Sequence, residues 1–188
     1  MKGVIWISLA VAAVLLLAGS RLAETRRYLE FQRRAAGEAW SEVDSALDRR
    51  ASLALRLVDA VRLASRQPRS GLSEITQASL ALGEVHSARG RMEAYARLDA
   101  ALSTVLIGIA HDPEFLPVET LRRLRDELAS AENLIAIKRR KYNDAVQKYN
   151  TSIELFPNNI AASLFGFARI DAYFQTEPAG RDLPQRKL

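Results

Sequence analysis

The sequence opens with an apolar run that carries no charged side chain between Gly3 and Ser20. As an α-helix these residues rise about 27 Å, which is close to the thickness of the hydrocarbon core of a bilayer. Trp6 lies near one end of the run, where interfacial aromatic side chains are favoured. We expect residues 1–20 to form a transmembrane anchor; a cleaved signal peptide and a buried core helix are the alternative interpretations.

Basic residues flank this run mainly on its C-terminal side. Lys2 precedes the run, whereas five arginines follow it: Arg21, Arg26, Arg27, Arg33 and Arg34. Because basic residues close to a membrane span favour the cytoplasmic side, the C-terminal part of the chain is predicted to be cytoplasmic.

Beyond the run, apolar positions recur every three or four residues, and no stretch alternates with the period of a β-strand. This pattern predicts long helices over residues 38–66, 73–110 and 118–156 and a short helix over residues 160–174. Breaks are predicted near Gly37, at residues 67–71, at residues 111–117 and at Phe156-Pro157. Ser73 is the expected N-cap of the second long helix.

The loops between the long helices are short, so neighbouring helices should run antiparallel. The predicted fold class is therefore all-α, with an N-terminal transmembrane helix followed by an elongated antiparallel up-and-down bundle of about four helices. This count includes the helix that continues out of the membrane through Arg34. Residues 21–175 form the bundle, and residues 176–188, which lack periodicity, form a disordered tail.

Charged residues inside the predicted helices are mostly typical of a solvated surface. Arg50 is an exception, because it interrupts the apolar stripe of the helix over residues 38–66. Glu127 and Glu132 have a solvent-facing spacing and are expected to pair with Arg123 and Arg139.

The composition argues against a chemical activity. The chain has no cysteine and two histidines among 188 residues, which excludes disulfides, thiolate metal sites and a histidine-rich metal centre. It contains no G-x-S-x-G, no phosphate-binding loop and no G-x-G-x-x-G. We expect no catalytic residues, no metal and no cofactor.

The net charge of +5 is a weak signal, and the most basic stretch is Lys138–Tyr149. A solvated helix face is the favoured interpretation of Lys138–Lys141, and a surface that faces anionic lipid is the other. Nucleic-acid binding would need exposed aromatic side chains among these charges, whereas Tyr142 and Tyr149 fall on the apolar side of the helix. No nucleic-acid partner is expected.

The most specific local pattern is a repeated Tyr-Asn pair. Tyr142-Asn143 and Tyr149-Asn150 are seven residues apart, so both pairs lie on one face of a helix. Asparagine is a poor helix former, and two of them here require compensating hydrogen bonds. One interpretation is a buried polar ladder to an adjacent helix, with the tyrosine rings in the core. The other is a ligand site.

At these residues the chain resembles the LemA family of bacterial membrane proteins. The resemblance covers Ala39–Val61 and Lys141–Phe174, although Leu55 and Arg56 stand where family members usually carry a Pro-Asn step. It implies a long antiparallel helical bundle on a single-pass anchor in the bacterial inner membrane, without an established enzymatic activity. The residues that carry it are Trp40, Arg49, Arg50, Tyr142, Asn143, Tyr149, Asn150, Phe156, Pro157, Gly166, Phe167, Tyr173 and Phe174.

These observations predict a membrane-anchored helical interaction or scaffold protein of the cell envelope. Its partners would be membrane lipid, at the N-terminal helix, and an unidentified protein whose helix binds an exposed helical groove. Assembly into homo-oligomers is left open. The alternative is a protein that binds anionic lipid or remodels membranes through the juxtamembrane arginines and Lys138–Lys141.

Overall fold

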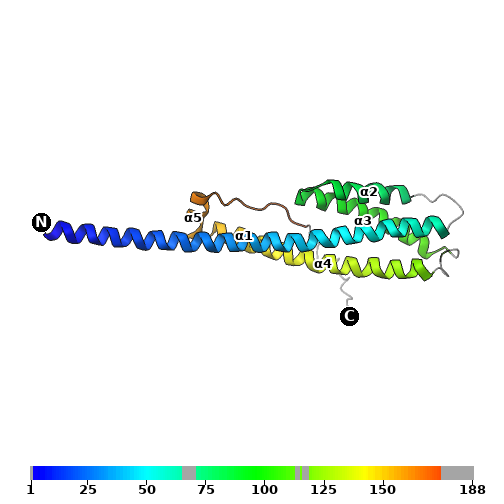
Figure 1. Cartoon of the computed structure of the whole chain (residues 1–188), viewed down its shortest axis with the longest axis horizontal. Helices are drawn as coiled ribbons and strands as arrows, with labels where there is room; N and C mark the ends of the chain where they lie inside the picture. Colours follow the sequence, from blue (N-terminus) through cyan, green and yellow to red (C-terminus); the bar gives the residue numbers. More distant parts are fainter. Residues whose placement is uncertain (1, 65–70, 113–114, 116–118, 175–188) are drawn as a thin grey trace, which may run out of the picture.

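The computed structural model describes residues 2–64, 71–112, 115 and 119–174. These residues form an elongated rod with the N-terminus at one end (Figure 1). The described parts contain helices and no strand, which confirms the all-α fold class. The helices are α1 (Lys2–Ala64), α2 (Leu72–Glu84), α3 (Ala88–Ala110), α4 (Glu119–Glu154) and α5 (Asn158–Phe165).

Helix α1 is continuous, so the predicted break near Gly37 is wrong. Its 63 residues rise about 94 Å. A glycine costs roughly 1 kcal/mol in a helix interior. Buried side chains on both sides of Gly37, such as Leu29 and Val43, pack the helix against its neighbours and offset this cost.

The single helix predicted over residues 73–110 is also wrong, because the chain folds back between α2 and α3. Val85 has an extended backbone, and the Ser87 side chain caps α3 by accepting a hydrogen bond from the Gly90 amide. A Cβ at residue 90 would lie 2.4 Å from Val85 Cγ1, so any larger residue at this corner would force the Val85 side chain to move. The prediction that Ser73 is the N-cap is wrong, because Ser73 lies within α2. The N-cap residue is Gly71, and no side-chain hydrogen bond caps this end of the helix.

The half of the rod far from the N-terminus is an antiparallel bundle of α1, α2, α3 and α4 (Figure 1). Its core consists of fully buried aliphatic side chains from every helix, among them Leu57, Ile75, Leu98 and Leu128. A bundle of about four helices is confirmed, although its membership differs from the prediction. The helix predicted to leave the membrane and the first predicted bundle helix together form α1. The second predicted bundle helix is divided into α2 and α3.

The half nearer the N-terminus is built differently. Here α1 and α4 lie side by side, and α5 followed by the extended residues 167–174 covers them (Figure 1). The short helix predicted over residues 160–174 therefore ends early. Gly166 adopts a left-handed conformation (φ 69°), and the Phe167 amide donates to the Ala162 carbonyl at 2.9 Å, which closes α5.

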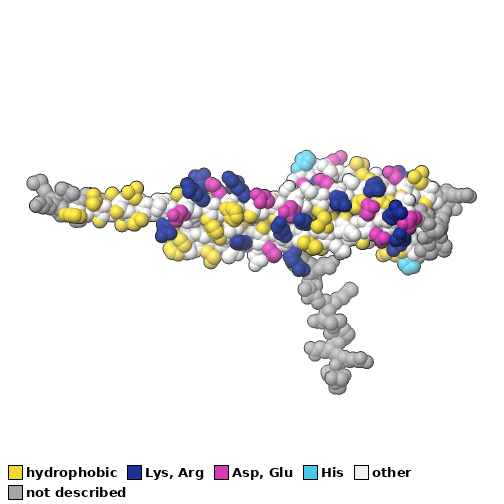
Figure 2. Space-filling view, turned by 60° about the horizontal axis from the view of Figure 1, so that its bottom comes forward, with side chains coloured by type: hydrophobic (Ala, Val, Ile, Leu, Met, Phe, Trp, Pro, Cys, Tyr) yellow, Lys and Arg dark blue, Asp and Glu magenta, His cyan; other side chains and the backbone are white. Residues whose placement is uncertain are grey.

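Residues 2–20 of α1 project beyond the other helices, and the side chains described among them are uncharged (Figure 2). Leu9, Val14 and Leu16 are each more than half exposed. Within the described residues, no helix meets the length and apolarity needed to cross a membrane. Met1, the side chains of residues 2–5, 7 and 8, and the predicted tail at 176–188 lie outside the description.

Candidate functional site on helix α4

The two asparagines of the Tyr-Asn repeat bind backbone groups of the extended segment, residues 167–174. Asn150 Nδ2 donates to the Ile170 carbonyl at 2.8 Å, and its Oδ1 accepts from the Ile170 amide at 3.0 Å. Asn143 repeats the arrangement with Phe174, at 2.9 and 3.1 Å. Each side-chain amide therefore satisfies both polar groups of one residue, as a paired β-strand would.

The two tyrosines extend this ladder. Tyr149 Oη donates to the Ala168 carbonyl and Tyr142 Oη to the Ala172 carbonyl, each at 2.8 Å. Every second residue of the segment, from 168 to 174, is thus held by a side chain of α4. The predicted ladder exists, but its partner is not a helix, because a helix uses its own backbone groups and an extended segment leaves them free.

The tyrosines donate these hydrogen bonds in their protonated form, which burial favours. Burial raises the pKa of Tyr142 to about 12, with a smaller contribution from Tyr173, and it also raises the pKa of Tyr149. The Tyr173 hydroxyl lies 2.6 Å from Asn150 Nδ2 and accepts its hydrogen bond. The polar atoms predicted as an alternative ligand site are therefore occupied by the chain itself.

An aromatic cluster fixes the far end of the segment. The Phe174 ring stacks on Trp40 of α1 at a centroid distance of 6.0 Å, and Tyr142 meets both rings edge-on. Trp40, Tyr142 and Phe174 lie far apart in the sequence, and the family resemblance singles out all three. The structure brings them together as one joint between α1, α4 and the extended segment.

Arg50 is the centre of a charge cluster that joins three helices. It is 5% exposed, and its guanidinium lies 2.7 Å from Asp99 of α3 and 2.6 Å from Glu132 of α4. It also donates to the Tyr95 hydroxyl, which in turn donates to Glu132. The predicted pairing of Glu132 with Arg139 is wrong, because the carboxylate is needed beside the buried Arg50.

The electrostatics of this cluster keep Arg50 charged and Tyr95 neutral. Burial alone would lower the pKa of Arg50, but its contacts with Tyr95 and the two carboxylates raise it overall. Burial raises the pKa of Tyr95, although Arg50 opposes this shift. Arg139 lies over the rings of Tyr95 and Phe174, at 4.4 and 5.0 Å, and so connects the cluster to the aromatic joint.

The basic stretch Lys138–Lys141 is partly used within the molecule. Lys138 and Lys141 donate to the two carboxylate oxygens of Glu42 on α1, at 2.7 and 2.8 Å. These hydrogen bonds lower the pKa of Glu42 to about 2. With two of its four cations paired to one carboxylate, the stretch is a weaker candidate for a lipid-binding surface than its composition indicates. Similarly, Glu127 pairs with Arg56 rather than Arg123.

The Glu42 site makes stability dependent on pH. Since the pKa of Glu42 falls from 4.5 to about 2 on folding, its contribution is present above pH 4.5 and is lost as the pH falls toward 2. We expect Glu42→Gln to flatten part of the acid-induced decrease in melting temperature, measured by circular dichroism. Glu119, whose pKa Arg122 and Arg123 also lower to about 2, contributes in the same pH range, and Glu119→Gln serves as a comparison. Identical acid profiles for Glu42→Gln and the natural chain would contradict the assignment.

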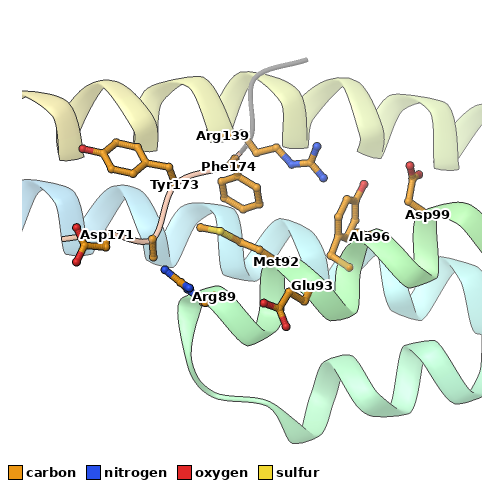
Figure 3. Close-up of a pocket in the computed structure, with 11 residues that line it drawn as sticks. Arg89, Met92, Glu93, Ala96, Asp99, Arg139, Asp171, Tyr173 and Phe174 are labelled. Atoms are coloured by element: carbon orange, nitrogen blue, oxygen red, sulfur yellow. The ribbon is translucent and has the colours of Figure 1, made fainter. Parts of the chain in front are cut away.

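An open pocket of about 560 Å³ lies where α3, α4 and the extended segment meet. Figure 3 shows Arg139 and Phe174 on one side and Met92, Arg89 and Glu93 of α3 on the other. Its lining mixes both signs of charge, and the described residues bring no three His, Asp or Glu side chains together as a metal site. Asn143 and Asn150 do not line the pocket.

The remaining residues of the resemblance have simpler positions. Arg49 is exposed beside Arg50, and Phe156 is 79% exposed at the turn between α4 and α5, where a cis peptide bond joins it to Pro157. Pro157 is the N-cap residue of α5, and Gly166 is its C-cap residue. Phe167 packs against the small apolar cluster around Leu29.

Sequence reasoning missed Arg91, a buried residue of α3. It donates to the Leu82 carbonyl at the end of α2 and to Asp48 of α1 at 2.9 and 2.5 Å, and it also pairs with Asp44. Arg91 therefore caps α2 and fixes the α2–α3 corner on α1. The available signal was an arginine next to the apolar Met92 in a helical pattern, which is too common to be informative.

These observations define a class of protein: an α-helical rod in which one helix face binds the extended C-terminal segment of the same chain. The model of the LemA family matches residues 39–187, and the chain belongs to this family. Among curated relatives, magnetosome proteins MamQ 1 and MamQ 2 of Paramagnetospirillum magneticum are 31% identical over 99 residues. Magnetosome protein MamQ of Magnetospirillum gryphiswaldense is 27% identical over 99 residues. Each match covers 53% of this chain and 36% of the relative, so the chain spans about a third of their length.

Proposed function

We propose that this protein is a non-enzymatic, membrane-anchored helical scaffold of the bacterial envelope. The observation that carries the proposal is the continuity of α1, which runs from an exposed apolar end into the core of the bundle. A single helix would then hold the rod on a membrane and fix its position there. The absence of charge between Gly3 and Ser20 supports a single-pass anchor in the inner membrane.

The arginines that follow this run support a cytoplasmic rod. Family membership and the magnetosome relatives are consistent with an organising role, although the match to them is partial. The rod itself needs no cofactor for its stability, because its apolar stripes are buried against one another.

The surface best suited to a protein partner is a groove between α2 and α3. It has a volume of about 820 Å³ and is lined largely by small side chains, including Ala78, Ala81 and Ala101, together with the charged Glu74 and Arg97. Small residues allow a second helix to approach closely, and the two charged side chains would set its orientation. The proposed partner is therefore an amphipathic helix of another envelope protein.

Site-specific photo-crosslinking in intact cells tests this proposal. A crosslinking residue at Gln77, which lies in the groove, is expected to form a covalent adduct with one other membrane-associated protein. The matched control is Arg125, an exposed residue of α4 outside the groove, and should give no such adduct. Equal adducts at both positions, or none at Gln77 in the membrane fraction, would contradict a scaffold role for the groove.

A further inference from the structure

A second apolar surface lies beside the N-terminal part of α1, at the turn between α4 and α5. It consists of Leu155, Phe156, Ile160, Leu164 and Phe165, which we call the α5 surface. Four of them are more than half exposed, and Phe156 reaches 79%. Ile160 and Leu164 are four residues apart and share one face of α5, whereas Ala161 and Ala162 are buried on the other. Exposed apolar side chains gathered in this way mark a surface that contacts a partner or a membrane.

The position of the α5 surface along the rod is set by contacts with α1. Arg26 lies over the Phe165 ring at 5.1 Å, and Ala162 packs in a buried cluster with Leu29. Arg26 is six residues beyond Ser20, or about 9 Å along a helix. The headgroup layer extends roughly 5–8 Å beyond the hydrocarbon core. If the apolar run spans a bilayer, the α5 surface therefore lies within one side-chain length of the headgroups.

The exposed residues near the proposed headgroup layer are of the types that contact lipid more often than protein. Among the described residues, the large aromatic side chains with high exposure are Trp6, Tyr28, Phe31, Phe156 and Phe165, all in the first half of α1 or at α5. Exposed apolar residues elsewhere on the bundle, such as Leu80 and Ile137, are aliphatic. Figure 2 shows hydrophobic and Lys or Arg side chains next to each other on the part of the rod that follows the N-terminal extension. Aromatic and basic residues together are characteristic of a membrane interface.

We propose that the α5 surface inserts into the interface of the same bilayer that holds the N-terminal helix. This inference rests on the proposed membrane anchor. A single helix leaves the rod free to rotate and tilt about its axis. Because α5 projects to one side of α1 (Figure 1), a second contact there fixes which side of the rod faces the membrane. The surface is thus a device for orientation as well as attachment.

Single-cysteine labelling of the full-length chain in vesicles tests the inference. The chain has no cysteine of its own, so Phe156→Cys, Leu164→Cys, Val14→Cys and Leu80→Cys each provide one thiol for an environment-sensitive fluorophore. All four side chains are exposed, and these substitutions remove little packing. In vesicles of phosphatidylcholine and phosphatidylglycerol, labels at 156 and 164 should emit at shorter wavelength than a label at 80. A spin label on the lipid headgroups should quench the fluorescence of the labels at 156 and 164. A spin label deep in the acyl chains should quench the fluorescence of the label at 14.

The outcomes separate this inference from the proposed function. Water-like emission at 156 and 164, with lipid quenching at 14, would overturn the α5 contact and leave the anchor intact. Water-like emission at 14 would overturn both. If the shift at 156 disappears when the protein-to-lipid ratio is lowered, the surface binds a second copy of the chain, and the lipid contact is wrong.

Discussion

Replacing Arg50 by alanine is expected to lower the free energy of unfolding by about 2–4 kcal/mol, because it removes a buried side chain where three helices meet and leaves the buried Tyr95 hydroxyl and two half-exposed carboxylates without their cation. Arg50 is 5% exposed and contacts both Asp99 and Glu132. The loss should appear as a lower denaturation midpoint for the full chain in detergent, followed by circular dichroism in urea. Exposed Arg49, its neighbour on α1, is the matched control, and Arg49→Ala should change stability by less than about 0.5 kcal/mol.

A double variant distinguishes loss of the cluster from loss of packing. Arg50→Met keeps much of the side-chain volume, and Glu132→Gln removes the carboxylate that would otherwise be stranded. The pair together should be more stable than Arg50→Met alone, because the carboxylate that lost its cation has been removed. Equal stability of the double variant and Arg50→Met would show that the charge adds little and that packing around the arginine stem is what matters.

The second large effect is expected at Asn150. Asn150→Ala should destabilise the chain by about 2–4 kcal/mol, since the amide and the carbonyl of Ile170 would both lose their partner. Hydrogen exchange measured by mass spectrometry should show lost protection over residues 167–174, with α2 and α3 unaffected. Gln147→Ala, on the exposed side of the same helix, is the matched control. Retained protection of the Ile170 amide in Asn150→Ala would refute the role of the ladder.

The helical period was sufficient to predict most of the fold, and its failures have identifiable causes. The period predicted a helix end at residue 66, where α1 is described to Ala64, and it predicted the bounds of α4 within two residues. It could not show whether Gly37 ends a helix, because glycine only weakens a helix that tertiary packing can rescue. The corner between α2 and α3 has a weak sequence signal, which is the N-cap residue Ser87 followed by Gly90. A serine and a glycine three residues apart also occur within continuous helices, so this signal does not by itself predict a corner.

The candidate site was predicted by its residues and not by its geometry. The Tyr-Asn spacing correctly indicated one polar face that needs hydrogen-bond partners. The partner could not be deduced, because the residues that follow Gly166 have an apolar pattern compatible with a helix. The sequence showed that Arg50 interrupts an apolar stripe. Its contacts with Asp99 and Glu132 could not be predicted, because they depend on how α1, α3 and α4 are aligned along the rod.

The direction of the extended segment determines where a fusion partner would emerge. Phe174 stacks on Trp40, which is 20 residues beyond Ser20 along α1, or about 30 Å. A protein joined after Phe174 would therefore leave from the side of the rod and not from one of its ends. A fluorescent tag joined there would crowd the α3 side of the rod, whereas an insertion between Ala64 and Gly71 would lie at the end of the rod far from the N-terminus and leave both flanks clear.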